Sequence, residues 1–281
     1  MVVGIYEKIK GQTGEKTKTE FLSYLEKYGV SFIELSEKNE VCDLIVVFGG
    51  DGTVLTAVSR AIGSDTPILA INTGTLGFLT SFEENEIELA AKKIRDGKLA
   101  FSERSLLEIS CENGKTAYAL NDAVIERTST AESRAVIAKL GVEIDGNPVY
   151  TLGADGVIVA SPTGSTAYSL SAGGVILDPG IPSFILTPIC SHSFGTRPIV
   201  FPDNKKVTVK VLANSSECVL TLDGRFAAKL SEGEEVRIGK SKIKLKLAEV
   251  VGSVAGDDTL LVVTHNETNA TTVVAKLKNL L

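Results

Sequence analysis

Short apolar runs alternate with amphipathic segments over the first hundred residues. Runs at residues 2–6, 30–35, 43–48 and 67–71 predict four strands. Apolar residues recur at helical spacing over residues 21–28, before Gly29, and a second helix is expected at 54–62. Residues 81–84 have the spacing of a capping box, which predicts a third helix that ends at Gly97. This alternation predicts an α/β domain over residues 1–98, with a doubly wound, mostly parallel sheet.

The pattern changes after residue 98 to short alternating runs. Asn113-Gly114, Asp145-Gly146 and Asp223-Gly224 separate these runs, and each dipeptide favours a hairpin turn. We therefore expect a mostly antiparallel all-β domain over residues 99–250. Residues 251–281 are interpreted as a tail with a strand at 260–264 and a helix at 271–281, which could return to the first domain.

The strand at 43–48 runs directly into a glycine-rich turn, Gly49-Gly50-Asp51-Gly52-Thr53. Glycines let a ligand approach the main chain closely, and Thr53 is expected to cap the following helix. Free N–H groups at such a helix start would form a phosphate cradle that contains Asp51. An acid in this position must hold a cation, orient a hydroxyl or take a proton, and phosphoryl transfer needs all three. The alternative is a tight turn in which Asp51 caps the helix.

Two further segments are rich in glycine and small residues. Residues 72–79 leave the end of a strand, where open α/β sheets bind ligands. Residues 155–174 combine a strand with a dense run of small residues on a predicted helix. The second segment favours a backbone pressed against a ligand, and the alternative is close packing of a helix on a sheet.

Composition narrows the range of partners. The chain has 281 residues, 43% hydrophobic and 23% charged, which is ordinary for a globular protein. Its net charge of −6 argues against a broad nucleic-acid surface. The four cysteines are far apart and form no Cys-x-x-Cys pair, so reduced thiols are expected. Neither a signal peptide nor a membrane-spanning run is found, and a cytoplasmic location is predicted.

Taken together, the segments resemble the NAD kinase family over roughly residues 40–250. The matching pieces are residues 49–53, 72–78, 120–122, 155–174 and 186–190, with Arg197-Pro198. Residues 163–168, with Asn121-Asp122 upstream, are the most specific of them. The resemblance implies transfer of a phosphoryl group from ATP, or in some members polyphosphate, to the 2′-hydroxyl of the adenosine ribose of NAD, which gives NADP.

The resemblance also implies roles for individual residues. Asp51 would be the catalytic proton acceptor. The predicted NAD-binding residues are Asp51, Gly52, Phe78, Asn121, Asp122, Gly153, Asp155, Thr166, Ala167, Tyr168 and Ser171, and the predicted phosphate-donor residues are Gly49, Gly50, Gly52 and Thr53. Because no P-loop lysine is present, Mg²⁺ or another divalent cation carried by the nucleotide must neutralise the phosphates. No protein metal ligand is assigned.

Three departures from the family pattern qualify these expectations. Gly153 stands where many members have a basic residue, and the family trend links that loss with acceptance of NADH. Arg225 replaces a more usual glutamine, and the tail beyond Val250 lacks the aromatic-rich ending of the family. The resemblance further implies a homodimer or homotetramer that binds NAD and ATP but neither nucleic acid nor membrane.

Two rival functions remain open at this stage. A lipid or sugar kinase with the same glycine-rich loop would need an apolar acceptor groove or a second basic phosphate site, and neither is visible. A catalytically silent dinucleotide sensor would keep the pocket and lose the chemistry. Asp51 argues against the sensor, because binding alone is expected to tolerate asparagine at this position.

Overall fold

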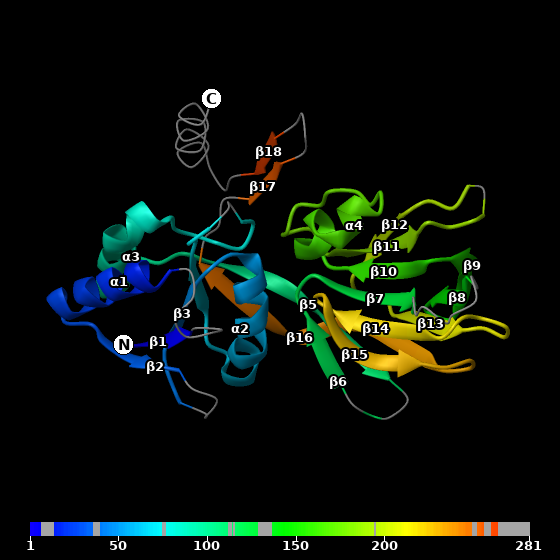
Figure 1. Cartoon of the computed structure of the whole chain (residues 1–281), viewed down its shortest axis with the longest axis horizontal. Helices are drawn as coiled ribbons and strands as arrows, with labels where there is room; N and C mark the ends of the chain where they lie inside the picture. Colours follow the sequence, from blue (N-terminus) through cyan, green and yellow to red (C-terminus); the bar gives the residue numbers. More distant parts are fainter. Residues whose placement is uncertain are drawn as a thin grey trace. The chain divides into compact units, whose positions relative to one another are not determined.

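The computed structural model describes residues 1–6, 14–35, 40–74, 77–111, 114, 116–128, 137–193, 195–248, 252–255 and 260–263. The chain divides into two compact units, Met1–Glu103 with Leu245–Leu281, and Arg104–Lys244 (Figure 1). Compactness does not show independent folding, so the domain division expected from the sequence stays a prediction. The helix expected at residues 271–281 lies outside the described residues.

A parallel sheet forms the centre of the first unit. Its strands are β1 (Val2–Tyr6), β2 (Ser31–Glu34), β3 (Leu44–Phe48) and β4 (Ile68–Ile71), in the order β2-β1-β3-β4. All these pairs are parallel, and the end of β16 (Glu235–Ala248) continues the sheet beside β4. Every residue of β3 and β4 is buried, because the sheet is covered on both faces. The prediction of a parallel α/β sheet is confirmed.

Helices cover the two faces of this sheet. One face carries α1 (Glu15–Lys27) and α3 (Ile87–Arg95), whose apolar residues share a core with alternate residues of β3. The buried side of α2 (Asp51–Ser64) is absent from that core, as expected for a helix on the opposite face. The short 3-10 helix η1 (Glu84–Glu86) leads into α3.

Two expectations about helix starts are wrong. The helix α2 begins at Asp51 with Gly50 as its N-cap, so Thr53 lies inside the first turn and does not cap it. The capping box before α3 is formed by Glu83 and Glu86, two residues later than residues 81–84 suggested. In both places neighbouring residues offer alternative starts for the helix, and the sequence pattern locates the helix better than its first residue.

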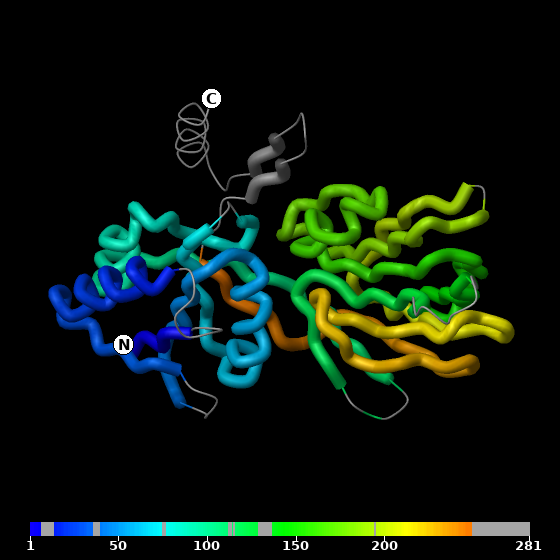
Figure 2. Tube along the Cα trace, in the orientation of Figure 1, coloured from blue at the N-terminus to red at the C-terminus, as the bar shows by residue number. Residues whose placement is uncertain are grey.

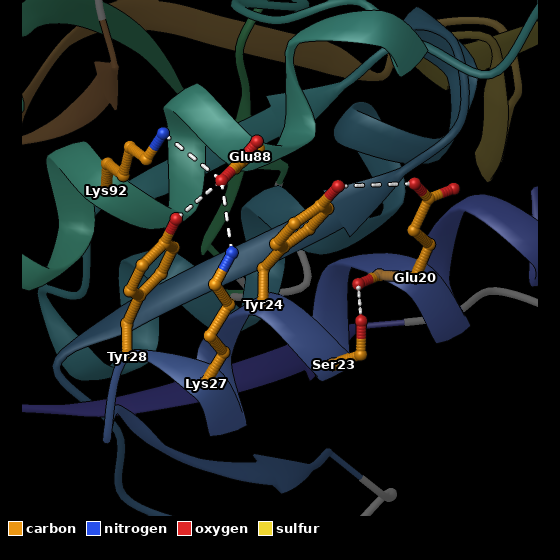
Figure 3. Close-up of polar contacts among 7 residues, drawn as sticks. All are labelled: Glu20, Ser23, Tyr24, Lys27, Tyr28, Glu88 and Lys92. Carbon is orange, nitrogen blue, oxygen red and sulfur yellow. Dashed lines mark hydrogen bonds and ion pairs between the residues drawn. The ribbon is translucent and has the colours of Figure 1, made fainter.

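A cluster of charged and aromatic side chains joins α1 to α3 (Figure 3). The Tyr28 hydroxyl donates to Glu88 at 2.6 Å, and Lys92 lies 3.1 Å from the same carboxylate. These hydrogen bonds lower the pKa of Glu88 to about 2. The guanidinium of Arg95 stacks 4.9 Å from the Tyr28 ring. The cluster therefore links α1 to α3 through side chains on their solvent-exposed side.

Two mostly antiparallel layers build the second unit. One is a six-stranded sheet with the order β12 (Ile199–Pro202), β11 (Ser183–Ile189), β10 (Gly156–Ala160), β7 (Asp122–Arg127), β14 (Cys218–Leu222) and β15 (Arg225–Leu230). The other layer holds β8 (Ala138–Ile144), β9 (Asn147–Ala154), β13 (Val207–Val211), β5 (Phe101–Cys111), β6 (Thr116–Ala119) and most of β16. Their inner faces share one core, and Figure 2 shows how distant segments lie side by side. The prediction of mostly antiparallel β-structure in the later part of the chain is confirmed.

The predicted Asp-Gly turns are present. Asp145-Gly146 joins β8 to β9 with φ values of 50° and 75°, and Asp223-Gly224 joins β14 to β15 with 49° and 72°. Positive φ at both positions is the signature of a type I′ hairpin. Asn113 lies outside the described residues, although β5 and β6 do pair. The other small hairpin, β17 (Gly252–Ala255) with β18 (Leu260–Val263), includes most of the strand expected at 260–264.

The helix expected within residues 155–174 is shorter than the sequence indicated. A 3-10 turn at Thr163–Thr166 is followed by a single turn, α4 (Tyr168–Ser171). Gly164 and Gly174 in this segment lie close to neighbouring main chain and side chains. No helix in the described ranges is long and apolar enough to cross a membrane.

The core of the first unit yields a stability prediction. Phe21 is fully buried and meets Phe48 edge to face, with ring centroids 5.5 Å apart. Phe21→Ala should cost the first unit about 3–5 kcal/mol of unfolding free energy, because it removes an aromatic ring and leaves a cavity. Urea unfolding of the full chain, followed by circular dichroism, measures this change. Leu89→Ala, at a residue of α3 that is 48% exposed, is the control and should change stability by less than about 0.5 kcal/mol.

Candidate functional site

In the first unit, the Asp51 carboxylate is held by the loop that follows β4. Its two oxygens accept the main-chain N–H groups of Phe78 and Leu79, each at 3.0 Å. Gly77 lies so close that a Cβ there would be 2.3 Å from Asp51 Oδ1. Asp51 is also the first residue of α2, where the helix dipole favours a negative charge. The structure therefore fixes the orientation of this carboxylate at the start of a helix.

This anchoring changes how Asp51 is interpreted. It does not cap its own helix, as the structural alternative proposed, because its oxygens bond to a different loop. Asparagine has one carboxamide oxygen and cannot accept both N–H groups in the same way. An aspartate is therefore favoured here for structural reasons too, and its presence alone does not separate an enzyme from a sensor.

The glycine-rich turn before Asp51 packs closely against the end of β4 and the first turn of α2. Gly49 has a φ of 145°, and its N–H donates to the Ile71 carbonyl at 3.0 Å. A Cβ at Gly49 would be 2.4 Å from the Thr53 hydroxyl, so only glycine fits. At Gly50 and Gly52, by contrast, a Cβ would meet nothing within 4 Å. These two residues therefore leave open space beside the turn, as a ligand cradle requires.

A cavity of about 410 Å³ opens at the carboxyl end of β4. It is lined by Asn72, Thr73, Gly74, Glu83, Glu84 and Asn85. The Asn72 carboxamide donates to Glu83 at 3.1 Å, and Glu84 accepts the Thr17 hydroxyl at 3.1 Å. Two carboxylates in one small cavity repel a bare anion, so this space suits a ligand that brings a cation.

In the second unit, Asp223 holds the main chain at Asn121 and Asp122. Its carboxylate accepts the N–H groups of Leu120 at 3.0 Å, Asn121 at 2.7 Å and Asp122 at 3.3 Å. The N–H of Asp223 in turn donates to the Asp122 carbonyl at 3.0 Å. Asp223 therefore fixes three consecutive peptide groups from the tip of the β14–β15 hairpin.

The same segment is held from its other side by residues 161–164. The Ser161 hydroxyl donates to the Leu120 carbonyl, and the Gly164 N–H donates to that hydroxyl at 3.1 Å. A Cβ at Gly164 would lie 2.1 Å from the Asn121 carbonyl oxygen. Only glycine fits at position 164, because its main chain contacts that of Asn121. The main chain of Asn121 is therefore held by Gly164 and by Asp223.

The pKa of the Asp122 carboxyl group is raised well above its ordinary value. It is only 4% exposed, and burial together with the charge of Asp223 raises the pKa of Asp122 to about 7. Burial also raises the pKa of Asp223, although its three N–H donors oppose that shift. A carboxyl group with a pKa near neutrality, next to an asparagine whose main chain is fixed, offers both donors and acceptors to a ligand.

A second polar group lies at the other end of β7 and β10. The Arg127 side chain donates from Nε to Asp155 Oδ1 at 2.7 Å, and the Arg127 N–H donates to the Asp155 carbonyl at 2.9 Å. Burial and the charges of Glu126, Cys190, Asp155 and Asp122 raise the pKa of Tyr168. Tyr168 is 42% exposed.

The remaining predicted residues lie in the short helical segment or beside it. The Thr166 hydroxyl is 3.5 Å from the Thr163 carbonyl, Ala167 joins the two turns, and Ser171 is exposed at the end of α4. Gly153, on β9, accepts the His192 N–H at 2.9 Å. A Cβ at Gly153 would meet only the end of the Ile137 side chain, 2.8 Å away.

Each unit thus gathers part of the predicted set. The first unit contains Gly49, Gly50, Asp51, Gly52, Thr53 and Phe78, and the second contains Asn121, Asp122, Gly153, Asp155, Thr166, Ala167, Tyr168 and Ser171. Their ligand-binding roles stay predictions. The sequence analysis missed the contributions of Asp223, Arg127, Ser161 and Gly164. Asp223 was interpreted only as a turn residue, and nothing in the sequence marked Arg127 as the partner of Asp155.

Comparison with protein families places both units in one family. The ATP-NAD kinase N-terminal domain matches residues 7–99, and the ATP-NAD kinase C-terminal domain matches residues 120–250. A third family model, the arginine repressor C-terminal domain, matches residues 241–279, of which the structure describes 241–248, 252–255 and 260–263.

Relatives and solved structures agree with this assignment. The chain is 40% identical over 225 residues to the NAD kinase of Carboxydothermus hydrogenoformans, covering 79% of each chain. It is 35% identical over 250 residues to the NAD kinase of Caldicellulosiruptor saccharolyticus, covering 87% of this chain and 93% of that one.

Two solved structures are similar over most of the chain. A yeast NADH kinase complexed with NADH has a TM-score of 0.79 and 26% identity, covering 92% of this chain and 84% of that one. An NAD kinase from Archaeoglobus fulgidus in complex with ATP has a TM-score of 0.74 and 26% identity, covering 89% and 94%. The predicted resemblance is confirmed: the chain belongs to the NAD kinase family and catalyses the ATP-dependent phosphorylation of NAD.

Proposed function

We propose that this kinase transfers the terminal phosphoryl group of ATP to the 2′-hydroxyl of the adenosine ribose of NAD, with Asp51 as the proton acceptor. The observation that carries the proposal is the fixed Asp51 carboxylate, which follows a glycine-rich turn and begins a helix. The likeness to a solved NAD kinase in complex with ATP supports ATP as the donor.

Asp51 can accept a proton without losing its anchor. Each of its oxygens accepts one N–H, from Phe78 or Leu79, and keeps a second lone pair free. A secondary hydroxyl is a poor nucleophile until its proton has an acceptor. A positioned base of this kind contributes about a hundredfold to ten-thousandfold in rate. Because both oxygens are tethered, little reorganisation is needed when the hydroxyl arrives.

The donor phosphates are assigned to the glycine-rich turn. Gly50 and Gly52 leave open space there, and the start of α2 offers main-chain N–H groups to an anion. A divalent cation such as Mg²⁺, entering with ATP, would neutralise the phosphate charge. Glu83 and Glu84 present carboxylate oxygens, the donor type that Mg²⁺ prefers, to the cavity at the end of β4.

The acceptor dinucleotide is assigned to the second unit. The Asn121 carboxamide has the donor and acceptor that an adenine edge requires, and the Asp122 carboxylate suits ribose hydroxyls. Both stand on main chain that Asp223 and Gly164 hold in place. Tyr168 is exposed enough to stack on a planar ring. Thr166, Ala167 and Ser171, from the adjacent turns, would complete this wall.

NADH is proposed as a second acceptor. Gly153 has no side chain where many family members carry a basic one, and a similar yeast protein is an NADH kinase complexed with NADH. A cytoplasmic location and a homo-oligomeric state are further proposals, and light scattering on the purified chain measures the second of them.

The role of Asp51 is tested by Asp51→Asn. This variant should lower kcat for NADP formation about a hundredfold or more, because it removes the acceptor of the hydroxyl proton and also weakens the anchor to the Phe78 and Leu79 N–H groups. Steady-state assays with ATP, Mg²⁺ and NAD measure it. Asp65→Asn is the matched control: Asp65 has a φ of 51° at the other end of α2, where asparagine fits equally well. A full-rate Asp51→Asn enzyme would contradict the proposal.

The environment of Asp122 predicts a pH dependence of NAD binding. The raised pKa, about 7, means that Asp122 loses its proton between pH 6 and 8, and its carboxylate then accepts the ribose hydroxyls. NAD affinity should therefore rise over this range. Asp223→Asn removes the like charge and keeps one side-chain oxygen for the Asn121 and Asp122 N–H groups, so the pKa of Asp122 should fall and the midpoint should move to lower pH. Calorimetric titration from pH 5.5 to 8.5 measures both midpoints, and a pH dependence that survives in Asp122→Asn would exclude this assignment.

Acceptance of NADH gives a direct comparison of rates. The wild-type rate with NADH should be comparable with the rate with NAD, since no basic side chain stands at position 153. Gly153→Lys should lower the relative NADH rate, and it is sterically feasible because only the end of Ile137 must move. Parallel assays that separate NADP from NADPH by chromatography measure these rates. A wild-type NADH rate far below the NAD rate would reject the proposal.

A further inference from the structure

The cavity at the carboxyl end of β4 lies directly beside the glycine-rich turn. Phe48 of β3 pairs in parallel register with Ile71 of β4, so Gly49 and Asn72 are the next residues on two neighbouring strands. The Gly49 N–H also donates to the Ile71 carbonyl at 3.0 Å. Neighbouring strands lie about 4.8 Å apart. A ligand that places its phosphates on the turn would therefore bring its next chemical group to this cavity.

Thr73, on the wall of the cavity, is a buried residue whose polar groups lack partners. It is 7% exposed, and within the part of the chain that the structure describes neither its hydroxyl nor its N–H makes a hydrogen bond. The start of α1 packs against it, since a Cβ at Gly14 would lie 3.0 Å from Thr73 Oγ1. A buried hydroxyl without a partner costs free energy. Thr73 therefore points to a polar ligand that completes its hydrogen bonding.

The two carboxylates of the cavity differ in how far they are already used. Glu83 accepts the Asn72 carboxamide at 3.1 Å and, in the capping box, the Glu86 N–H. Glu84 is exposed, and within the described ranges its side chain accepts one hydrogen bond, from the Thr17 hydroxyl to Oε1 at 3.1 Å. The second oxygen of Glu84 is therefore available to a donor on a ligand.

A ligand that suits these groups carries hydroxyl donors close to its phosphates. A carboxylate accepts hydrogen bonds and repels a bare phosphate, whereas the neighbouring hydroxyls of a ribose donate to it. A cation is the other common partner of a carboxylate. However, among the described residues no group of three or more His, Cys, Asp or Glu side chains could hold a metal ion. The cavity volume of about 410 Å³ is within the range of small-molecule sites.

We propose that this cavity binds the ribose of the phosphate donor, with Glu84 accepting its 2′- and 3′-hydroxyls and Thr73 completing the contact. The inference rests on the proposed function and deepens it, because it names the part of ATP that the enzyme selects. The cation then stays on the phosphates and keeps water among its ligands. Glu84 is used by the sugar rather than by the cation, and it determines donor specificity.

A donor without ribose hydroxyls tests the inference. The kcat/KM for ATP should exceed that for 2′,3′-dideoxy-ATP about tenfold, because the analogue leaves Glu84 without its hydrogen-bond donors. Glu84→Ala should lower kcat/KM for ATP about tenfold and bring the ratio between the two donors close to one. Assays of NADP formation at saturating NAD and Mg²⁺ measure both. Glu26→Ala is the matched control, since Glu26 is an exposed acid near the other end of α1. It should leave the ratio unchanged.

Thr73→Val separates ligand contact from structural support. Valine keeps the shape of the side chain and loses a hydroxyl that has no partner within the described residues, so the melting temperature should not fall. The KM for ATP should nevertheless rise about two- to tenfold, with KM for NAD unchanged. A purely structural role would lower the melting temperature and leave the ratio between ATP and its dideoxy analogue fixed.

The outcomes distinguish the inference from the function beneath it. If the wild-type protein forms NADP but uses 2′,3′-dideoxy-ATP as well as ATP, the inference is overturned and the proposed function stands. If Glu84→Ala slows both donors equally and raises the Mg²⁺ concentration at half-maximal rate, Glu84 holds the cation and the inference is again overturned. If no NADP forms from ATP, the proposed function fails and the inference fails with it. Loss of donor discrimination in Glu84→Ala, at an unchanged Mg²⁺ requirement, would support the inference.

Discussion

The geometry of the first unit depends on one carboxylate that binds two main-chain N–H groups. Asp51 joins the start of α2 to the loop after β4 through Phe78 and Leu79, and Gly77 allows the close approach. The buried strands β3 and β4 deliver both segments to the same edge of the sheet. A proton acceptor is useful only when its direction is fixed, and here secondary structure and hydrogen bonding fix it together.

The second unit applies the same device to the proposed acceptor site. Asp223 accepts three consecutive N–H groups, and Gly164 closes the opposite side of Asn121 at a distance that admits no side chain. The consequence is electrostatic as well as structural, because burial and the charge of Asp223 raise the pKa of Asp122 to about 7. The hairpin tip therefore holds this main chain in place and, together with burial, raises the pKa of Asp122.

Much of this architecture follows from local sequence. Apolar runs predicted β1 to β4, and Asp-Gly pairs predicted the hairpins, because these signals act within a few residues. The roles of Asp223 and Arg127 could not be predicted in this way. Asp223 acts on residues about a hundred positions away and Arg127 on one 28 positions away, so only strand pairing reveals them. The errors at Thr53 and at residues 81–84 have a different origin, since a sequence pattern locates a helix better than its first residue.

Identification of the phosphorylated hydroxyl tests the central claim most directly. The purified chain would be incubated with ATP, Mg²⁺ and NAD, and the product examined by phosphorus and proton magnetic resonance. The account predicts a new phosphate monoester coupled to the 2′ proton of the adenosine ribose. Phosphate on the 3′-hydroxyl or on the nicotinamide ribose, or no transfer from ATP, would contradict it.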